Sequence, residues 1–432
     1  MINYKTAGRA VLFASLIGGL IAPAMAQSAQ SGHEHDSAFY RNRNDSVIDR
    51  ERPQFQSEGI QRGAWIWKPV LRLGVLSDDN IYASATNTQS DLIYSINPSL
   101  EVETTWSVHG FEAYVSGHQL EYSDFSDESL WTSALGAAGH IDFAPRTRFD
   151  IGADFANLSE PRWSSGFASM TVDPIEFETS SYKAKISQEF SRTRIEFGAE
   201  LNSYDYDDGV FILGGVADQD FRDRDETIFS LRGDFALNPD RSIFVRVRSN
   251  DRQYDLQPPA VAATRDSSGY MIDVGADFDI DGVARGIIGV GYNEQDYDNP
   301  AFGTLEGFGV DGVLEWYLTR LTTVTFAGSR YIEDSPIVNT GGLTATSLSV
   351  SIDHELRRNV ILSASIERQS DDYLGIDRED ERWSTSASAT YLMNRHVGIR
   401  GEIRRTDQES TGLAAGRDFE INTIGLRLIL RP

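Results

Sequence analysis

The chain has 432 residues, and its 65 Asp and Glu residues outnumber its 39 Lys and Arg residues, which gives a formal net charge of −26. The absence of cysteine excludes a disulfide scaffold, a cysteine-ligated zinc site and a thiol nucleophile. The acidity argues against nucleic acid as a partner, because no basic stripe is present to neutralise phosphates. The high content of Gly, Tyr and Phe leaves a soluble β-protein or a membrane β-barrel, and a large barrel forms a single domain at this length.

The first 26 residues have the pattern of a secretory signal peptide. Lys5 and Arg9 precede an apolar run over 10–22, and Ala24 and Ala26 provide a small-residue exit. We expect cleavage after Ala26. A membrane anchor is the alternative, but the run is shorter than the ~18–20 apolar residues that a spanning helix needs. The mature chain is therefore predicted to cross the inner membrane.

Residues 27–62 form a polar segment that follows neither a strand period nor a helix period. Ser31, Gly32, Asn44 and Pro53 are typical of its composition. Such a segment is expected to be extended or disordered, and we place it in the periplasm. The predicted organisation is a signal peptide over 1–26, a periplasmic N-terminal arm over 27–62 and an outer-membrane barrel over 63–432.

From Trp65 onward, apolar and polar residues alternate with a period of two, as in the segments 149–155, 243–248 and 272–278. This period places one set of side chains on each face of a sheet. Turn signals divide the region into eighteen predicted strands: 65–77, 91–107, 111–124, 130–144, 148–160, 177–191, 194–207, 225–238, 242–255, 268–281, 284–297, 305–319, 322–333, 342–356, 359–373, 380–393, 396–409 and 417–430.

The connections between these strands alternate in length. Turns such as 192–193 and 320–321 are very short, whereas 161–176 and 208–224 are long and polar. Long strands, an even strand count and alternating connections are typical of an outer-membrane barrel. We therefore predict an all-β fold, a closed antiparallel transmembrane β-barrel of about 18 strands, with 16–18 allowed by the pattern. The two longest loops are the segments that could fold into the lumen.

Aromatic residues support this topology, because tryptophans lie at strand ends and not in mid-strand. Trp106 and Trp316 lie at short-turn ends, and Trp131 and Trp383 lie at long-loop ends. Amphipathic rings belong at the two membrane interfaces. The lipid bilayer with its lipopolysaccharide is therefore an expected partner. The last strand, with Gly425 and Leu428 before Leu430, resembles a signal for the barrel-insertion machinery, although Arg431 and Pro432 replace the usual terminal aromatic residue.

Charged residues that alternate with apolar ones are expected to face the lumen, because a charge on the lipid face costs several kcal/mol. A barrel of ~16–18 strands is too wide for side chains alone to fill, so the lumen is either a water channel or plugged. The candidate lumen charges are Arg194, Glu200, Arg232, Asp234, Arg246, Arg248, Arg400 and Arg404.

Tyrosines and aspartates also recur where the upward strands are expected to leave the membrane. We predict that they form one extracellular rim, whose rings pack on sugar rings and whose carboxylates accept sugar hydroxyls. The alternative is an interfacial girdle with solvated loop charge. The rim also predicts a preference for cations. Its candidate residues are Tyr204, Asp205, Tyr254, Asp255, Tyr297, Asp298 and Tyr373.

No catalytic, cofactor or metal site is predicted. The glycines 307, 309 and 312 match a dinucleotide pattern, but they continue into an alternating strand and not into a helix. The acids from Asp277 open like a calcium loop, yet Ile288 occupies the position of the required glutamate. No nucleophile–base pattern is present. The chain is therefore not expected to be an enzyme.

Several motifs along the chain resemble one known family. They include 49–53 (Asp-Arg-Glu-Arg-Pro), 78–82, 204–208, 222–226, 295–298, 353–359, 373–380 and 394–395. In this order they resemble the putative beta-barrel porin 2 family of outer-membrane barrels, which is often linked to exopolysaccharide or capsule production. The resemblance implies the fold, the outer membrane of a Gram-negative bacterium and a role in transport, with a polysaccharide as a further partner.

Two functions remain open from the sequence. The first is a porin-like channel associated with exopolysaccharide export or with passage of polar solutes. The second is a structural or surface-interaction barrel with a closed or plugged lumen. The presence or absence of ion conductance separates the two.

Overall fold

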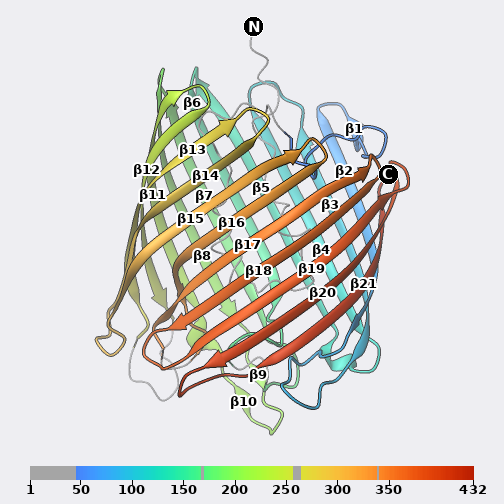
Figure 1. Ribbon diagram of the computed structural model, residues 1–432. Coiled ribbons are helices and arrows are strands. Elements are labelled where there is room, and N and C mark those ends of the chain that lie inside the picture. Colours follow the sequence, from blue (N-terminus) through green and yellow to red (C-terminus); the bar gives the residue numbers. More distant parts are fainter. Residues whose placement is uncertain (1–44, 167–169, 256–263, 338–339) are drawn as a thin grey trace.

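The structure is a computed structural model that describes residues 45–166, 170–255, 264–337 and 340–432. The predicted signal peptide and the first part of the predicted arm lie outside the described residues. Within the described chain, eighteen strands form a closed antiparallel barrel (Figure 1). The predicted fold class is therefore confirmed. No helix in this part of the chain is long and apolar enough to cross a bilayer.

Each predicted strand overlaps one observed barrel strand, and the ends differ by no more than three residues. The barrel strands are β2 (Trp65–Asp78), β3 (Asp91–Thr104), β4 (Gly110–Tyr122), β5 (Leu130–Ala144), β6 (Thr147–Ser159), β7 (Glu176–Glu189), β8 (Thr193–Tyr206), β11 (Arg224–Asn238), β12 (Arg241–Tyr254), β13 (Ser267–Ile280), β14 (Ala284–Tyr297), β15 (Thr304–Thr319), β16 (Thr322–Asp334), β17 (Gly342–Arg357), β18 (Val360–Tyr373), β19 (Glu379–Leu392), β20 (Val397–Thr411) and β21 (Phe419–Leu430).

The barrel closes between its first and last strands. Residues 71–78 of β2 pair with 423–430 of β21, which leaves the start of β2 uncovered on that side. The short strand β1 (Ile60–Arg62) covers it by pairing with Trp65–Trp67. Closure gives the backbone groups of the edge strands their partners, which a sheet inside a membrane requires.

The period of two separates the side chains into an outer and an inner face. On β12, Ile243 and Val245 are 46% and 51% exposed, whereas Phe244 between them is 3% exposed. Arg246 bonds Asp311 of β15 at 3.1 Å, although β13 and β14 lie between their strands in the sheet. A contact of this kind crosses the interior, so even-numbered residues of β12 face the lumen. The outer face carries the apolar side chains that contact lipid.

The two ends of the barrel differ. At the short-turn end the strands are joined by tight connections such as 145–146, 239–240 and 320–321, and the C-terminus lies there (Figure 1). At the long-loop end lie 160–175 and 207–223, and the latter carries the hairpin of β9 (Gly209–Val210) and β10 (Val216–Ala217). The short 3-10 helices η2 (Ser126–Glu128) and η3 (Asp220–Arg222) also lie at this end.

Exposed tryptophans mark both ends of the outer face. Trp67, Trp106 and Trp316 are 40–50% exposed near the short turns, and Trp131 and Trp383 are 48% and 39% exposed near the long loops. This distribution gives two aromatic girdles, which is the arrangement that membrane interfaces favour.

The segment before the barrel differs from the unstructured arm that its composition predicts. Val47 is fully buried and its backbone N–H donates to Thr323 Oγ1 at 3.0 Å. Arg52 is 3% exposed and bonds Glu355 at 3.0 Å. Thr323 and Glu355 lie on the inner face of β16 and β17, next to the short turns. Residues 46–56 therefore fold into the short-turn mouth of the barrel. The physical reason is that the barrel wall supplies buried partners that the polar segment itself lacks.

Candidate solute pathway

The inner face of β8 to β15 is filled by ion pairs. Arg232 bonds Asp234 at 2.7 Å, and Arg246 bonds Asp273 at 3.1 Å as well as Asp311. Asp234 and Asp273 are almost completely buried, and their arginines are 10% and 12% exposed. Arginine–carboxylate pairs satisfy each other in this geometry. This ion-pair wall therefore fills one side of the lumen and offers little free charge.

The remaining predicted lumen charges on this side are also engaged. Arg194 forms an ion pair with Glu196, and Lys183 approaches Glu200 at 3.4 Å. The Arg248 guanidinium lies 2.9 Å from the sulfur of Met271. The structure thus gathers six predicted residues on the β8–β12 wall: Arg194, Glu200, Arg232, Asp234, Arg246 and Arg248.

Arg400 and Arg404, the other two predicted charges, lie on a different wall. Both contact Glu402, at 3.0 and 3.2 Å. Their side chains are 21% and 23% exposed, about twice the values in the ion-pair wall. Charge is therefore accessible to water near β20, whereas it is mostly neutralised and covered near β12.

Between these regions, the inner faces of β17, β18 and β19 carry small hydroxyl side chains. Ser365 lies opposite both Ser351 and Ser386 in the two strand pairs, and its Oγ is 2.8 Å from that of Ser386. We call this set the hydroxyl wall: Ser349, Ser351, Ser363, Ser365, Ser384, Ser386, Ser388 and Thr390, all partly accessible. Small side chains leave the lumen wide here, and hydroxyls both donate and accept hydrogen bonds.

Sequence reasoning missed the hydroxyl wall, although its signal is present. The run from Ser384 to Thr390 alternates Ser or Thr with Thr or Ala. Because threonine and alanine are weak markers of a lipid face, the run does not show by itself which set points inward. The register of β19 with β18 and β20 settles this orientation.

Near the long-loop end, inner side chains join strands that are not neighbours in the sheet. Arg224 of β11 and Arg252 of β12 both bond Asp334 of β16 at 2.9 Å. All three side chains are at most 10% exposed. Buried charges that share hydrogen bonds in this way tie β11 and β12 to β16, and removing one partner is costly.

The described residues 160–166 of the loop after β6 fold inward at the same end. Arg162 bonds Glu128 at 2.6 Å, and Ser165 Oγ lies 2.7 Å from the Tyr373 hydroxyl on the opposite side of the barrel. Trp163 packs beneath Arg382, whose guanidinium carbon lies 4.2 Å from the centre of the Trp163 ring. The long-loop mouth is therefore narrowed by a loop that lies across it.

Arg417 lies near Arg162, Arg378 and Arg382 in this mouth, and Arg162 and Arg378 are paired with Glu128 and Asp380. Arg417, in the loop before β21, donates to the backbone carbonyls of Tyr82 and Arg162. Burial, together with repulsion from Arg162, Arg378 and Arg382, lowers the pKa of Arg417 to about 10. The guanidinium stays charged at neutral pH and adds to the electrostatic potential inside the mouth.

The structure divides the expected rim into two sets. Tyr204, Tyr254, Tyr297 and Tyr373 are only 4–9% exposed and face inward. Arginine side chains cover several of these rings, as Arg224 does for Tyr204 at 4.0 Å. The aspartates of the expected rim, Asp205, Asp255 and Asp298, are exposed.

The split has a simple physical reason. Adjacent residues in a strand point to opposite faces, so Tyr204 and Asp205 cannot line one surface while both remain in β8. The expected single rim of stacked rings and carboxylates therefore needs correction: the rings belong to the inner lining, and the carboxylates belong to the exterior.

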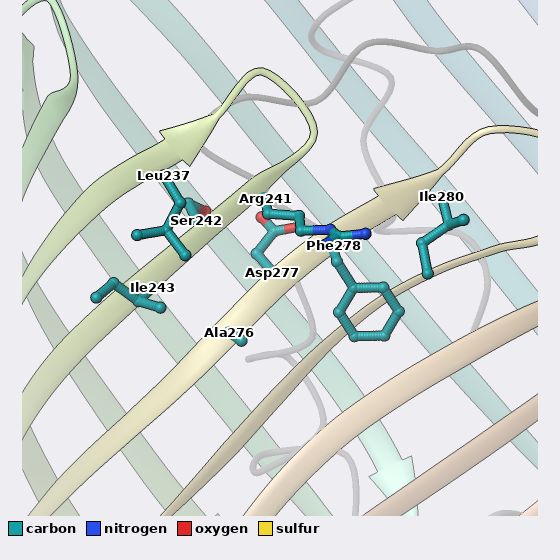
Figure 2. A pocket seen from close by; sticks show the side chains of 8 residues that line it. All are labelled: Leu237, Arg241, Ser242, Ile243, Ala276, Asp277, Phe278 and Ile280. Atoms are coloured by element: carbon teal, nitrogen blue, oxygen red, sulfur yellow. The ribbon is translucent and has the colours of Figure 1, made fainter.

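A shallow pocket between β11, β12 and β13 does not belong to the lumen. Its apolar lining includes Leu237, Ile243 and Phe278, which are outer-face residues near the short-turn end (Figure 2). In a membrane this recess faces lipid. Three exposed carboxylates at the opposite end, Asp208, Asp218 and Asp220, have oxygens within 4.8 Å of one another. Exposed acidic groups of this kind are common without an ion.

The fold is that of an outer-membrane β-barrel of the porin class, and together with the family match that follows it points to a channel rather than to an enzyme. The family model described as "Putative beta-barrel porin 2" matches residues 52–431. The chain belongs to this family. No curated protein is similar enough in sequence to count as a relative.

Solved porin structures resemble the barrel at low sequence identity. OccK5 (OpdH) of Pseudomonas aeruginosa is 14% identical, with a TM-score of 0.44, and the match covers 85% of this chain and 98% of that one. A BenF-like porin from Pseudomonas fluorescens Pf-5 is 12% identical, with a TM-score of 0.44 and coverage of 88% and 100%. Acinetobacter baumannii OccAB3 is 10% identical, with a TM-score of 0.45 and coverage of 85% and 99%.

Proposed function

We propose that the barrel is a channel for polar solutes and that its cargo includes the sugar chains of an exopolysaccharide. The observation that carries the proposal is the hydroxyl wall. It is a surface of small donor and acceptor groups in the accessible part of the lumen, interrupted by Glu367, which lies opposite Ser349 and Ser384. Sugar hydroxyls exchange hydrogen bonds with such a surface in the way that water does, so a saccharide slides along it without being trapped.

The passage runs beside the hydroxyl wall because the opposite side is filled. Asp234 and Asp273 are buried beneath their arginines, whereas Ser386 and its neighbours keep partial access to water. A solute therefore meets hydroxyls on one side and a neutralised ion-pair wall on the other. In this proposal the export signal of 1–26 is cleaved, and the insertion machinery recognises β21.

Purified protein in planar bilayers tests the proposal. Wild-type protein should give discrete conductance steps, and neutral oligosaccharides should interrupt the current. Ser386→Leu should lower the conductance, because a larger inner side chain narrows the passage. The matched control is Thr385→Leu, on the exposed outer face of the same strand, which should leave the conductance unchanged. Equal effects of the two variants would remove the hydroxyl wall from the pathway.

A closed structural barrel is the second candidate, and a specific observation favours it. Residues 160–166 lie across one mouth and residues 46–56 lie in the other. If both segments seal the lumen, wild-type protein inserted in bilayers gives no steps. Correct insertion is then verified by resistance to SDS before heating, so that a sealed barrel is distinguished from an unfolded one.

A further inference from the structure

A row of arginines follows the seam where the barrel closes. β20, β21 and β2 are neighbours in the sheet, and their inner faces carry Arg72, Arg400, Arg404 and Arg427, which we call the arginine strip. Glu402 is the carboxylate that bonds this strip, through Arg400 and Arg404. In the part of the chain that the structure describes, Arg72 and Arg427 make no ion pair within 4 Å, unlike the paired charges of the ion-pair wall.

The strand register makes this arrangement unfavourable for the barrel alone. Arg400 and Arg427 lie directly opposite each other in the β20–β21 pair. Like charges at opposite positions destabilise a sheet. Arg427 also feels repulsion from Arg404 and repels Arg72. Glu402 attracts Arg427 electrostatically, but among the described residues Arg427 makes no ion pair within 4 Å, so this attraction does not become a direct contact.

Local arrangements that cost stability concentrate at functional positions. The groups that surround the strip do not remove its positive charge. Arg72 donates to the neutral side chains of Asn97 and Ser99, and His118 lies near Arg427. Asp353 lies close enough to Arg400 to interact electrostatically, but it accepts its hydrogen bond from Ser363. The strip therefore remains a site for a second anion.

The hydroxyl wall adjoins this strip residue by residue. Arg404 lies opposite Ser386, and Arg400 lies opposite Thr390, in the β19–β20 pair. Directly opposite side chains in antiparallel strands have Cβ atoms ~4.5–5.5 Å apart. A ligand that contacts both surfaces must therefore carry an anionic group and hydroxyls within one sugar unit.

We propose that the arginine strip binds the carboxylates of acidic saccharides, such as uronic acid chains, while the hydroxyl wall holds their hydroxyls. This inference rests on the proposed function and names its cargo class. Arginine suits the role because its planar fork binds a carboxylate in a bidentate manner. The cation preference expected from the acidic loops does not extend to this surface, because the acidic residues of the expected rim face outward.

Calorimetric titration of the detergent-solubilised full chain tests the inference, with tetragalacturonic acid as the acidic probe and maltotetraose as the neutral one. Wild-type protein should bind the acidic probe more tightly than the neutral one, and more weakly as KCl rises. Arg427→Gln and Arg400→Gln should each weaken acidic binding by about tenfold. Neither variant should change maltotetraose binding.

Arg405→Gln is the matched control. Arg405 follows Arg404 on the same strand but points outward, where it bonds Asp407 and Glu420. The Arg405→Gln variant should bind tetragalacturonic acid and maltotetraose with the same affinities as the wild type. Arg427→Gln should also keep or raise the resistance of the barrel to heat in SDS, because it removes a like-charge contact. A loss of binding in a destabilised variant would instead indicate a structural role for the arginine and would overturn the inference.

Two other results would also overturn it: no binding of the acidic probe by wild-type protein, or equal binding by wild type and Arg427→Gln. Conductance measured separately keeps the two proposals distinct. If the protein conducts but binds both probes equally, the proposed function stands and the inference of an acidic cargo is overturned. If the protein binds the acidic probe but does not conduct, the arginine strip is confirmed as a binding site and the channel function is overturned.

Discussion

At the scale of single residues, neighbours in the sequence have opposite environments. Val245 is 51% exposed on the outer face, and the adjacent Arg246 bonds two aspartates inside. The period of two predicts these faces, because successive side chains of a strand point to opposite faces of the sheet. It does not predict that the arginine is structural, since its partners lie on β13 and β15.

Substitutions at these two positions should both destabilise the barrel, for different reasons. Val245→Arg places a cation against lipid, at a cost of ~2–4 kcal/mol near the midplane. Arg246→Val leaves Asp273 buried without its partner, at a cost of ~3–5 kcal/mol. Unfolding in urea, followed by heat-modifiability on gels, measures both effects.

The double variant Arg246→Val/Asp273→Asn separates the two causes. It should recover part of the stability lost in Arg246→Val, because the buried charge is gone. Asp273→Asn should give no recovery when combined with Val245→Arg. If the double variant is as unstable as Arg246→Val alone, the ion-pair wall is not the source of the loss.

At the scale of elements, the segment 46–56 and the inward-folded residues 160–166 narrow the two mouths of the barrel. Each is held by buried polar contacts, such as Arg52 with Glu355 and Arg162 with Glu128. Loops without an apolar stripe give no periodic signal, so their docking depends on partners that the barrel provides. The Arg52–Glu355 contact also brings together two of the motifs that resemble the family, 49–53 and 353–359, which are far apart in the sequence.

Glu355→Gln should loosen the segment 46–56. Arg52 would keep its burial but lose its counter-charge, which is unfavourable inside a protein. We expect faster tryptic cleavage after Arg50, since Pro53 blocks cleavage after Arg52, and a larger single-channel conductance as the mouth opens.

Glu58→Gln is the control for this prediction. Glu58 bonds Arg395, but the two side chains are 74% and 47% exposed, and exposed pairs contribute little. Its cleavage rate and conductance should match those of the wild type. Unchanged cleavage in Glu355→Gln would show that the Arg52 contact does not hold the segment in place.

At the scale of the whole molecule, the barrel has a short-turn end and a long-loop end, and outer-membrane barrels direct short turns to the periplasm. We predict that the long loops face the outside of the cell. The structure offers a suitable reporter position, because Leu213 at the tip of the β9–β10 hairpin is fully exposed and Gly214 beside it has φ of +89°.

An epitope tag inserted after Gly214 should be labelled on intact cells, and a tag at Asp240 in a short turn should be labelled only after the outer membrane is permeabilised. Both tagged proteins should remain folded, since neither insertion interrupts a barrel strand. Labelling of Asp240 but not of the hairpin tip on intact cells would reverse the proposed orientation.

The sequence by itself determined the strands, their approximate ends and the face of most side chains. These properties depend on the alternation of neighbouring residues and on turn residues, which are local. It also determined the aromatic girdles, because the interfaces lie where the strands end. The family resemblance added the porin class, which the match over residues 52–431 establishes.

Only the tertiary structure decided which inner charges are neutralised and which remain accessible. Barrel closure brings β12 within reach of β15 and β16, and it places Glu355 beside Arg52, although these residues are remote in the chain. It also places Arg400 opposite Arg427 and beside the hydroxyl wall. Contacts across a closed lumen depend on strand number and register together, and no local pattern encodes them.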